Sequence, residues 1–550
     1  MADIDKQARR IKPLEALSND DENNVNDKTY LLDRHDHEAE ENYLDGIFTA
    51  KDGTLSIDDI VNSSVVGLFH IFVTISCGLC YSTATIILNA YSSFIVAACD
   101  LHITISNSSW VGSSLSIGMM IGSLVLGIVS DYIGRRKTIL ISVSCNIIIM
   151  IVSAFSYNYL MAALLAFLNG FCLGGVITSC HPYMVEFLPK QYRGLSVPCM
   201  TSFVIFGTIY CNVAGFLILP FRFYYPIGEI YFTSWRLHFI ICTVPMLIGI
   251  LSLLFLPNSL RFTLKRGNTI QVVQIFNQID RINAFCYCKK KSWHRLKTNA
   301  FLSYCVAKNM DKIQISTTAT TLRQTIATLT QWPWLKRLIV ISVGWFGYCF
   351  IFKGLVQWWP VIISYYSKGH SCWHNSFNSS VIEHSLSSNY SVTTFCIGSS
   401  RLRFVLTNLI IGNLLAIPVA IACILLINRT GRKFQFCAFA IIMSLLVFLI
   451  WIIDNALSTT ILVIIFIAVS NNVWLPLKLW TSELFLTKVR ATVFGICNVI
   501  GNLGALLCIA IFPVLFQASC IAALTIPAAI WLVCSLLCII LPDTTESNID

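Results

Sequence analysis

The chain has 550 residues, of which 56% are hydrophobic and 12% are charged, and its formal net charge is +10 at pH 7. This composition is far more apolar than that of an average soluble domain, so it excludes an ordinary soluble protein and indicates a membrane protein. Because the basic residues lie beside apolar segments, the positive charge indicates membrane topology and gives no sign of nucleic-acid binding.

The first sixty residues differ from the rest of the chain. They contain sixteen Asp or Glu and seven Lys or Arg, a net charge of 7 − 16 = −9, and no long apolar run. Such a segment cannot bury a core, so residues 1–60 are predicted to form a disordered acidic tail. They carry no signal-peptide pattern, and we expect the first membrane helix to act as an uncleaved signal.

Beyond the tail, long uncharged stretches alternate with short polar segments. One bilayer crossing needs about 20 apolar residues. The uncharged stretches of that length are Ile60–Cys99, Leu101–Ser130, Thr138–Met184, Gly194–Phe221, Leu237–Leu256, Phe404–Asn428, Phe434–Ile453, Asn455–Leu477 and Ala491–Pro542. Leu338–Ser364 is an equally long apolar stretch with one charge, Lys353. Two of these, at 138–184 and 491–542, are long enough for two helices each. They would break at the polar turns 157–159 and 517–519, which gives an all-α membrane protein of twelve helices.

The twelve predicted helices fall into two groups of six. We expect an N-terminal bundle over residues 61–257 and a C-terminal bundle over 338–542, joined by a hydrophilic segment at 258–337. That segment holds fourteen Lys or Arg and two acids, Asp280 and Asp311. Further basic clusters follow the second, fourth, eighth and tenth helices. By the positive-inside rule, this segment and both termini, 1–60 and 543–550, are predicted to be cytosolic.

The loop 365–403 lies on the other side of the membrane in this topology. It contains two N-glycosylation sequons, at Asn378 and Asn389. It also contains Cys372 and Cys396, which could form a disulfide in an oxidising compartment. Most of the twenty-two cysteines instead fall inside apolar helices, where we interpret them as small hydrophobic residues.

Two landmarks recur in the chain at one spacing. Ser130–Lys137 reappears in weaker form as Ile427–Lys433, and Glu186–Arg193 reappears as Glu483–Arg490. The offsets are 431 − 134 = 297, 483 − 186 = 297 and 490 − 193 = 297. A shared offset predicts two similar halves. In a membrane protein, this arrangement is typical of a transporter with its site between the halves.

These landmarks belong to a larger set of motifs. The set comprises Gly127-x-x-x-Asp131-x-x-Gly134-Arg135-Arg136-Lys137, Glu186–Gly194, Thr233–Arg236, Leu256–Phe262, Trp358–Pro360 and Thr481–Thr492. It resembles the major facilitator superfamily over about residues 55–542. In finer detail it resembles the synaptic vesicle glycoprotein 2 family and related sugar and organic-cation carriers. The resemblance implies two pseudo-symmetric six-helix bundles that rock about a site near the membrane midplane.

The cytosolic helix ends are predicted to form a conformational latch. An acid at such a boundary favours the positive end of a neighbouring helix dipole and can release it in another conformation. The latch residues are Gly127, Asp131, Gly134, Arg135, Arg136, Glu186, Arg193, Gly431, Arg432, Glu483 and Arg490. We expect the networks of Asp131, Glu186 and Glu483 to hold the inward-closed state.

The candidate binding site contains charges deep in the predicted helices. Lys353 is the deepest, sixteen residues after Arg337 and about 24 Å along a helix, and an intramembrane charge is a functional hypothesis by default. For Lys478 the alternative is snorkelling toward Glu483 at the cytosolic face. The resemblance implies that Trp345 and Trp474 are cavity aromatics. The full predicted site is Trp345, Lys353, Gln357, Trp358, Trp474, Lys478, Asn498 and Asn502.

Two functions remain open. In the first, the chain carries a small organic solute, and cationic side chains without buried acids favour an anionic or neutral one. In the second, it is a transporter-shaped vesicle glycoprotein that binds a trafficking partner through its acidic tail. Loss of acids from the first helix, and Asn428 where the family carries Asp, favour the second. We expect plasma or vesicle membrane in either case, and no enzymatic activity, cofactor, metal or nucleic acid.

Overall fold

The computed structural model describes most of the chain from residue 61 onward. The described residues are 61, 66–101, 104–221, 223–227, 230–266, 269–284, 327, 329–367, 397–453, 455–485 and 489–543. They all belong to one compact unit. The acidic tail 1–60, the sequons Asn378 and Asn389, and the cysteines Cys372 and Cys396 lie outside the described residues, so those predictions stay untested.

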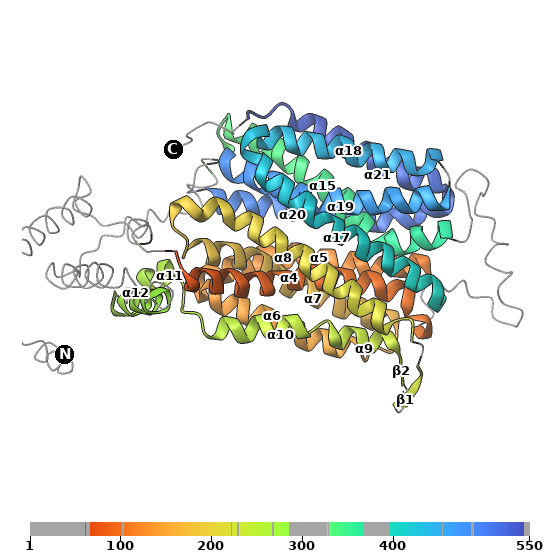
Figure 1. Ribbon diagram of the computed structural model, residues 1–550, viewed down its shortest axis with the longest axis horizontal. Helices are drawn as coiled ribbons and strands as arrows, with labels where there is room; N and C mark the ends of the chain where they lie inside the picture. The colour runs from red at the N-terminus through yellow and green to blue at the C-terminus, as the bar shows by residue number, and fades with distance from the viewer. Residues whose placement is uncertain are drawn as a thin grey trace, which may run out of the picture. The chain divides into compact units, whose positions relative to one another are not determined.

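Long helices account for nearly all of the described structure (Figure 1). Those of the first half are α4 (Leu68–Ala97), α5 (Ile105–Ile133), α6 (Arg135–Ser153), α7 (Tyr159–Val185), α8 (Ser196–Ile218), α9 (Ser234–Ile241) and α10 (Val244–Leu254). Those of the second half are α15 (Trp334–Ser367), α17 (Ser399–Thr430), α18 (Arg432–Ile453), α19 (Ala456–Leu484), α20 (Arg490–Ala518) and α21 (Cys520–Cys538).

Twelve spans within the described residues are long and apolar enough to cross a membrane, with α9 and α10 together forming the sixth. This number confirms the sequence prediction. Short elements connect the spans: η1 (Cys99–Leu101), η2 (Lys190–Leu195), α11 (Leu260–Lys265), α12 (Thr269–Ala284), and the antiparallel hairpin of β1 (Tyr225–Ile227) and β2 (Ile230–Phe232). The helices α11 and α12 occupy the start of the segment that was predicted only as a basic loop.

The helix boundaries have local causes. At the two predicted turns, Asn158 caps α7 and Ser519 caps α21, each accepting a hydrogen bond from a backbone N–H of the first helical turn. Gly134 and Gly431 form the joints α5–α6 and α17–α18 with φ of +101° and +86°. Residues with a Cβ rarely adopt this backbone conformation, which explains why glycine occurs at both positions.

The helices of each half pack closely, and several pack across the boundary between the halves. In Figure 1 the first half is coloured red to yellow-green and the second half green to blue, and the two lie side by side. Helices α5 and α7 approach so closely that a Cβ on Gly122 would lie 2.0 Å from the backbone oxygen of Phe171. Small residues at such contacts are typical of membrane helices. Between the halves, α5 packs on α20, α8 on α17, and α4 on α15.

Candidate functional site

A cavity lies between the two halves. Its walls come from α4 and α8 of the first half and from α15, α17 and α19 of the second. Its lining includes five side-chain amides and one ammonium group: Asn89, Asn212, Gln357, Asn413, Asn471 and Lys353. Groups from both halves therefore face one space, as the sequence repeat predicts for a transporter site.

Lys353 is the sole ionisable residue among the described side chains that line the cavity. Its Nζ donates a hydrogen bond to Oδ1 of Asn502 on α20 at 2.8 Å. Gln357, one helical turn further along α15, lines the same cavity. The structure thus brings Lys353, Gln357 and Asn502 of the predicted site together.

Two cavity residues have unsatisfied hydrogen-bonding groups. Among the described residues, neither Nδ2 nor Oδ1 of Asn212 has a partner, and Nε2 of Gln357 also has none. The side chains themselves are 1% and 2% exposed. Since buried polar groups are nearly always hydrogen-bonded, a polar ligand in the cavity would supply what these two residues lack.

The aromatic part of the predicted site forms a separate cluster. The Trp345 and Trp474 rings meet edge to face with centroids 4.7 Å apart, and Trp345 Nε1 donates to Oγ1 of Thr481 at 3.0 Å. Lys478 Nζ lies 4.7 Å from the Trp474 ring centroid and donates to the Tyr81 hydroxyl at 2.8 Å. It therefore contacts the other half of the molecule, at Tyr81 on α4.

This cluster lies beyond the cavity, toward the end of the molecule that is predicted to be cytosolic. Lys478 is seven residues beyond Asn471 on α19, and Tyr81 is four residues before Thr85 on α4. At 1.5 Å per residue these offsets are about 10 and 6 Å. The cavity lining does not include Trp345, Trp474 or Lys478. Of these three, Lys478 reaches the first half, at Tyr81.

The remaining two predicted site residues lie outside the cavity lining. Trp358 is fully buried and stacks on Phe512 with ring centroids 5.2 Å apart, whereas its neighbour Trp359 lines the cavity. Asn498 is 6% exposed, and its Nδ2 has no partner among the described residues. Sequence reasoning missed Asn212, whose signal was an isolated Asn within an otherwise apolar stretch.

The predicted latch contains one ion pair in each half. Arg135 Nη1 lies 2.7 Å from Glu186 Oε1, and Arg432 Nε lies 3.2 Å from Glu483 Oε1. Both members of the second pair follow the first by 297 residues. The second oxygen of Glu186 also accepts a hydrogen bond from Ser259. Each pair joins helices of one half.

Other latch residues bond to backbone carbonyls. Arg193 Nε donates to Leu188 O at 3.0 Å, and Arg490 Nη2 donates to Phe485 O at 3.4 Å, again 297 residues apart. Arg136 donates to the carbonyls at the end of α10. A Cβ added to Gly127 would lie 3.9 Å from the Thr178 side chain on α7, which is an ordinary van der Waals contact. Asp131 is exposed, and the described residues give it no hydrogen bond or ion pair.

A buried ion pair that the sequence did not predict lies at the opposite end. Arg236 Nη2 is 2.9 Å from Asp100 Oδ2, with side chains 2% and 13% exposed. Trp235 Nε1 donates to the other carboxylate oxygen at 2.7 Å. Arg236 Nη1 donates to two carbonyls after α6, Ala154 O and Ser156 O. This network anchors α9 to the ends of α4 and α6.

Two cysteines at the same end of the molecule are oxidised. Cys99 in η1 and Cys520 at the start of α21 are each disulfide-bonded, whereas the other fifteen described cysteines are free. The sequence interpretation placed both among the small hydrophobic residues of the apolar helices.

The chain is similar to membrane transporters of known family. The model of the Major Facilitator Superfamily matches residues 73–508. Synaptic vesicle glycoprotein 2C of Rattus norvegicus is 28% identical over 282 residues, 49% of this chain and 39% of that protein. Synaptic vesicle glycoprotein 2B of Homo sapiens is 26% identical over 285 residues, which are 48% of this chain and 41% of that protein. The match thus spans about two fifths of these relatives.

Solved structures share the fold at lower identity. The partially occluded inward-open xylose transporter XylE from E. coli has a TM-score of 0.60 at 15% identity, covering 88% of this chain and 99% of XylE. A second XylE structure is described as the proton:xylose symporter bound to 6-bromo-6-deoxy-D-glucose. It has a TM-score of 0.57 at 16% identity and covers 86% of this chain and 96% of XylE. At this identity the likeness shows the twelve-helix, two-bundle fold.

Proposed function

We propose, since this chain belongs to the Major Facilitator Superfamily, that it carries a small organic solute across a membrane by alternating access. The solute would bind in the cavity between the halves. The observation that carries the proposal is the pair of unsatisfied amides, Asn212 from the first half and Gln357 from the second. A ligand that bonds to both would link the two halves, and its binding would therefore depend on their relative position.

An anionic or neutral solute fits this cavity better than a cation. Lys353 supplies the one positive charge of the described lining, and no described lining residue is acidic. In a site of low dielectric constant, a like charge near Lys353 would be strongly disfavoured. A carboxylate or another anionic group would replace Asn502 as the partner of Lys353, or share the ammonium with it. A neutral polyol could instead bond to the surrounding amides.

The alternative function has one observation in its favour. Lys478 fills the space between Tyr81 and Trp474 and joins the halves on one side of the cavity. A contact that stays closed would suit a membrane glycoprotein that binds a trafficking partner and moves no solute. In a carrier, the same contact would be the barrier that opens once per cycle. The two functions therefore differ in whether this contact breaks.

Uptake into proteoliposomes tests the proposal. Labelled anionic and neutral metabolites would be offered to wild type and to Lys353→Met, with Lys336→Met as a matched control on the exposed start of the same helix. We expect uptake that persists in the control and falls by tenfold or more in Lys353→Met, because a hydrogen bond to a charged group contributes about 1.5–3 kcal/mol. Absence of uptake for every compound by folded wild type would refute transport and favour the binding protein.

A further inference from the structure

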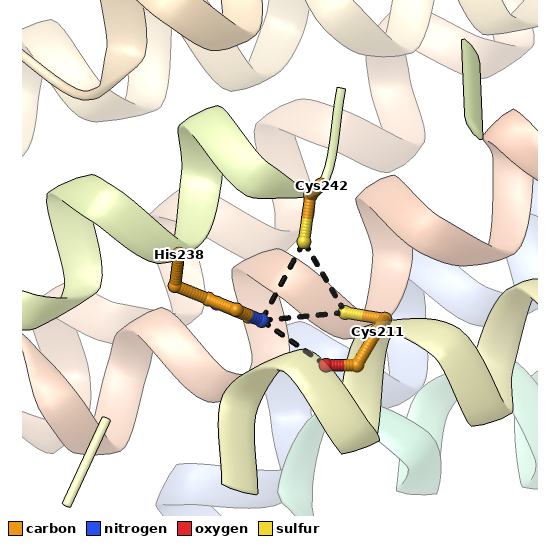
Figure 2. Close-up of side chains that lie close together, drawn as sticks. All are labelled: Cys211, His238 and Cys242. Carbon is orange, nitrogen blue, oxygen red and sulfur yellow. Dashed lines mark hydrogen bonds between the residues drawn. The ribbon is translucent and has the colours of Figure 1, made fainter. Parts of the chain in front are cut away.

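A cluster of two cysteines and one histidine lies between the fifth and sixth spans, and none of its residues belongs to the cavity lining or the predicted latch (Figure 2). Cys211 is on α8, His238 is on α9, and Cys242 directly follows α9. The three side chains point toward one another and are 0–1% exposed. Sequence spacing did not indicate a metal site here, because Cys211 is 27 residues from His238.

The donor atoms have the spacing of a single tetrahedral site. The Sγ atoms of Cys211 and Cys242 are 3.8 Å apart, and His238 Nε2 lies 3.8 and 3.5 Å from them. Zinc binds sulfur at about 2.3 Å and imidazole nitrogen at about 2.0–2.1 Å. Tetrahedral angles at these lengths place two sulfurs about 3.8 Å apart and a sulfur and nitrogen about 3.6 Å apart. The observed distances match both values.

The surrounding structure holds the donors in place. His238 and Cys242 are four residues apart, which brings them to one face of the helix. The Tyr210 hydroxyl donates to Ile241 O at 2.9 Å and ties α8 to the end of α9. The buried Arg236 network fixes the start of α9. The donors are therefore positioned before any ion binds.

The fourth corner of the site has two sources of a ligand. The backbone oxygen of Cys211 lies 3.1 Å from His238 Nε2. Gly215 leaves space beside the same nitrogen, where a Cβ would lie 3.5 Å from it. The carbonyl oxygen, or a water in the space beside Gly215, could complete four-coordination.

From this geometry we propose that Cys211, His238 and Cys242 bind Zn²⁺. Two thiolates and a neutral imidazole are soft donors of the kind that zinc prefers. With both thiols deprotonated, the Zn²⁺ site is neutral, whereas a Cu⁺ site with the same ligands carries one negative charge. Burial in an apolar environment strongly disfavours the charged site. Binding releases both thiol protons to solvent.

The proposed zinc site lies next in sequence to a residue that lines the cavity. Cys211 immediately precedes Asn212, which lines the cavity and has two unsatisfied polar groups. A zinc ion would hold this part of α8 against α9, within the first half. Since α8 also packs on α17 of the second half, the ion would stiffen a helix that takes part in both ligand binding and contact between the halves.

Metal content of the full-length protein tests this inference without any measurement of transport. Detergent-purified wild type would be incubated with ZnCl₂, dialysed, and its zinc measured by mass spectrometry. We expect about one zinc per chain in wild type and about none in the Cys211→Ser/Cys242→Ser variant. The matched control Cys508→Ser, which removes another buried free cysteine on α20, should retain the zinc. Zinc-free wild type, or equal zinc in the double variant, would overturn the proposal.

A second measurement avoids the risk that the double variant does not fold. In wild type under mild denaturation, Zn²⁺ should slow the alkylation of Cys211 and Cys242 at least tenfold and leave Cys508 unchanged. Replacement of Zn²⁺ by Co²⁺ should give a thiolate-to-cobalt absorption band. If peptide mapping instead finds Cys211 and Cys242 joined as a disulfide, or alkylated at the same rate with and without Zn²⁺, these residues do not form a metal site.

Discussion

The buried pair of Asp100 and Arg236 gives the sharpest stability prediction. In Asp100→Asn, the guanidinium loses its counter-ion while its side chain stays 2% exposed. Removal of one partner from a buried pair costs about 3–5 kcal/mol, because the other charge is left uncompensated. Here Asp100 is 13% exposed, and two carbonyls still accept from Arg236. We therefore expect Asp100→Asn to lower the free energy of unfolding by about 3 kcal/mol, the lower end of this range.

The assay is the free energy of unfolding in detergent. Asp131→Asn is a matched control, since Asp131 is exposed and the described residues give it no hydrogen bond or ion pair. The control should stay within about 0.5 kcal/mol of wild type, as surface substitutions usually do. The double variant Asp100→Leu/Arg236→Met should recover part of the loss, because it removes the uncompensated charge but leaves Trp235 Nε1 and the carbonyls of Ala154 and Ser156 without their partners. If Asp100→Asn were as stable as its control, the pair would contribute nothing and the reasoning would fail.

Three further predictions concern other contacts. Glu186→Gln should lower the free energy of unfolding by about 1–3 kcal/mol, since its buried carboxylate pairs with Arg135, and exchanging the two charges between these positions should restore most of it. Lys478→Met should remove the hydrogen bond to Tyr81, which contributes about 1.5–3 kcal/mol. Backbone hydrogen exchange in α4 and α19 should then become faster, and an unchanged exchange rate would contradict a gating role for this contact. In unreduced digests the peptide containing Cys99 should be found as a disulfide, and recovery as a free thiol would contradict the oxidised state.

The spans were predictable because the bilayer imposes their length and hydropathy. Each apolar stretch in the sequence corresponds to one or two of the spans, and both long stretches break where predicted, at Asn158 and Ser519. These residues act through local hydrogen bonds that the sequence alone can indicate. Gly134 and Gly431, which have positive φ, belong to the motif that recurs at the 297-residue offset, and a repeated glycine indicates a repeated backbone requirement.

The side-chain sites were less predictable because they depend on packing between distant helices. Asp100 and Arg236 are 136 residues apart in sequence, and no local pattern connects them. The resemblance implied that Trp345 and Trp474 are cavity aromatics, whereas the two rings meet each other and contact Lys478 and Thr481 in a cluster beside the cavity. Their distance from the cavity depends on the relative tilt of helices, which neither hydropathy nor motif spacing specifies.

The two latch ion pairs bear on how the halves would move. Arg135 with Glu186 and Arg432 with Glu483 join helices of the same half. They can therefore brace each bundle as a rigid body, but they do not themselves hold one bundle against the other. Rocking of two rigid bundles requires that contacts between them be few and individually breakable.

The hydrogen bonds described between the two halves are of this individually breakable kind. Lys478 bonds to Tyr81 beside the cavity, and Ser92 bonds to the carbonyl of Val356 in its wall. Each contributes at most about 3 kcal/mol. A solute that bonds to Asn212 and Gln357 could supply a comparable free energy. It follows that ligand binding alone could shift the equilibrium between the two positions of the bundles, without any acid in the first helix.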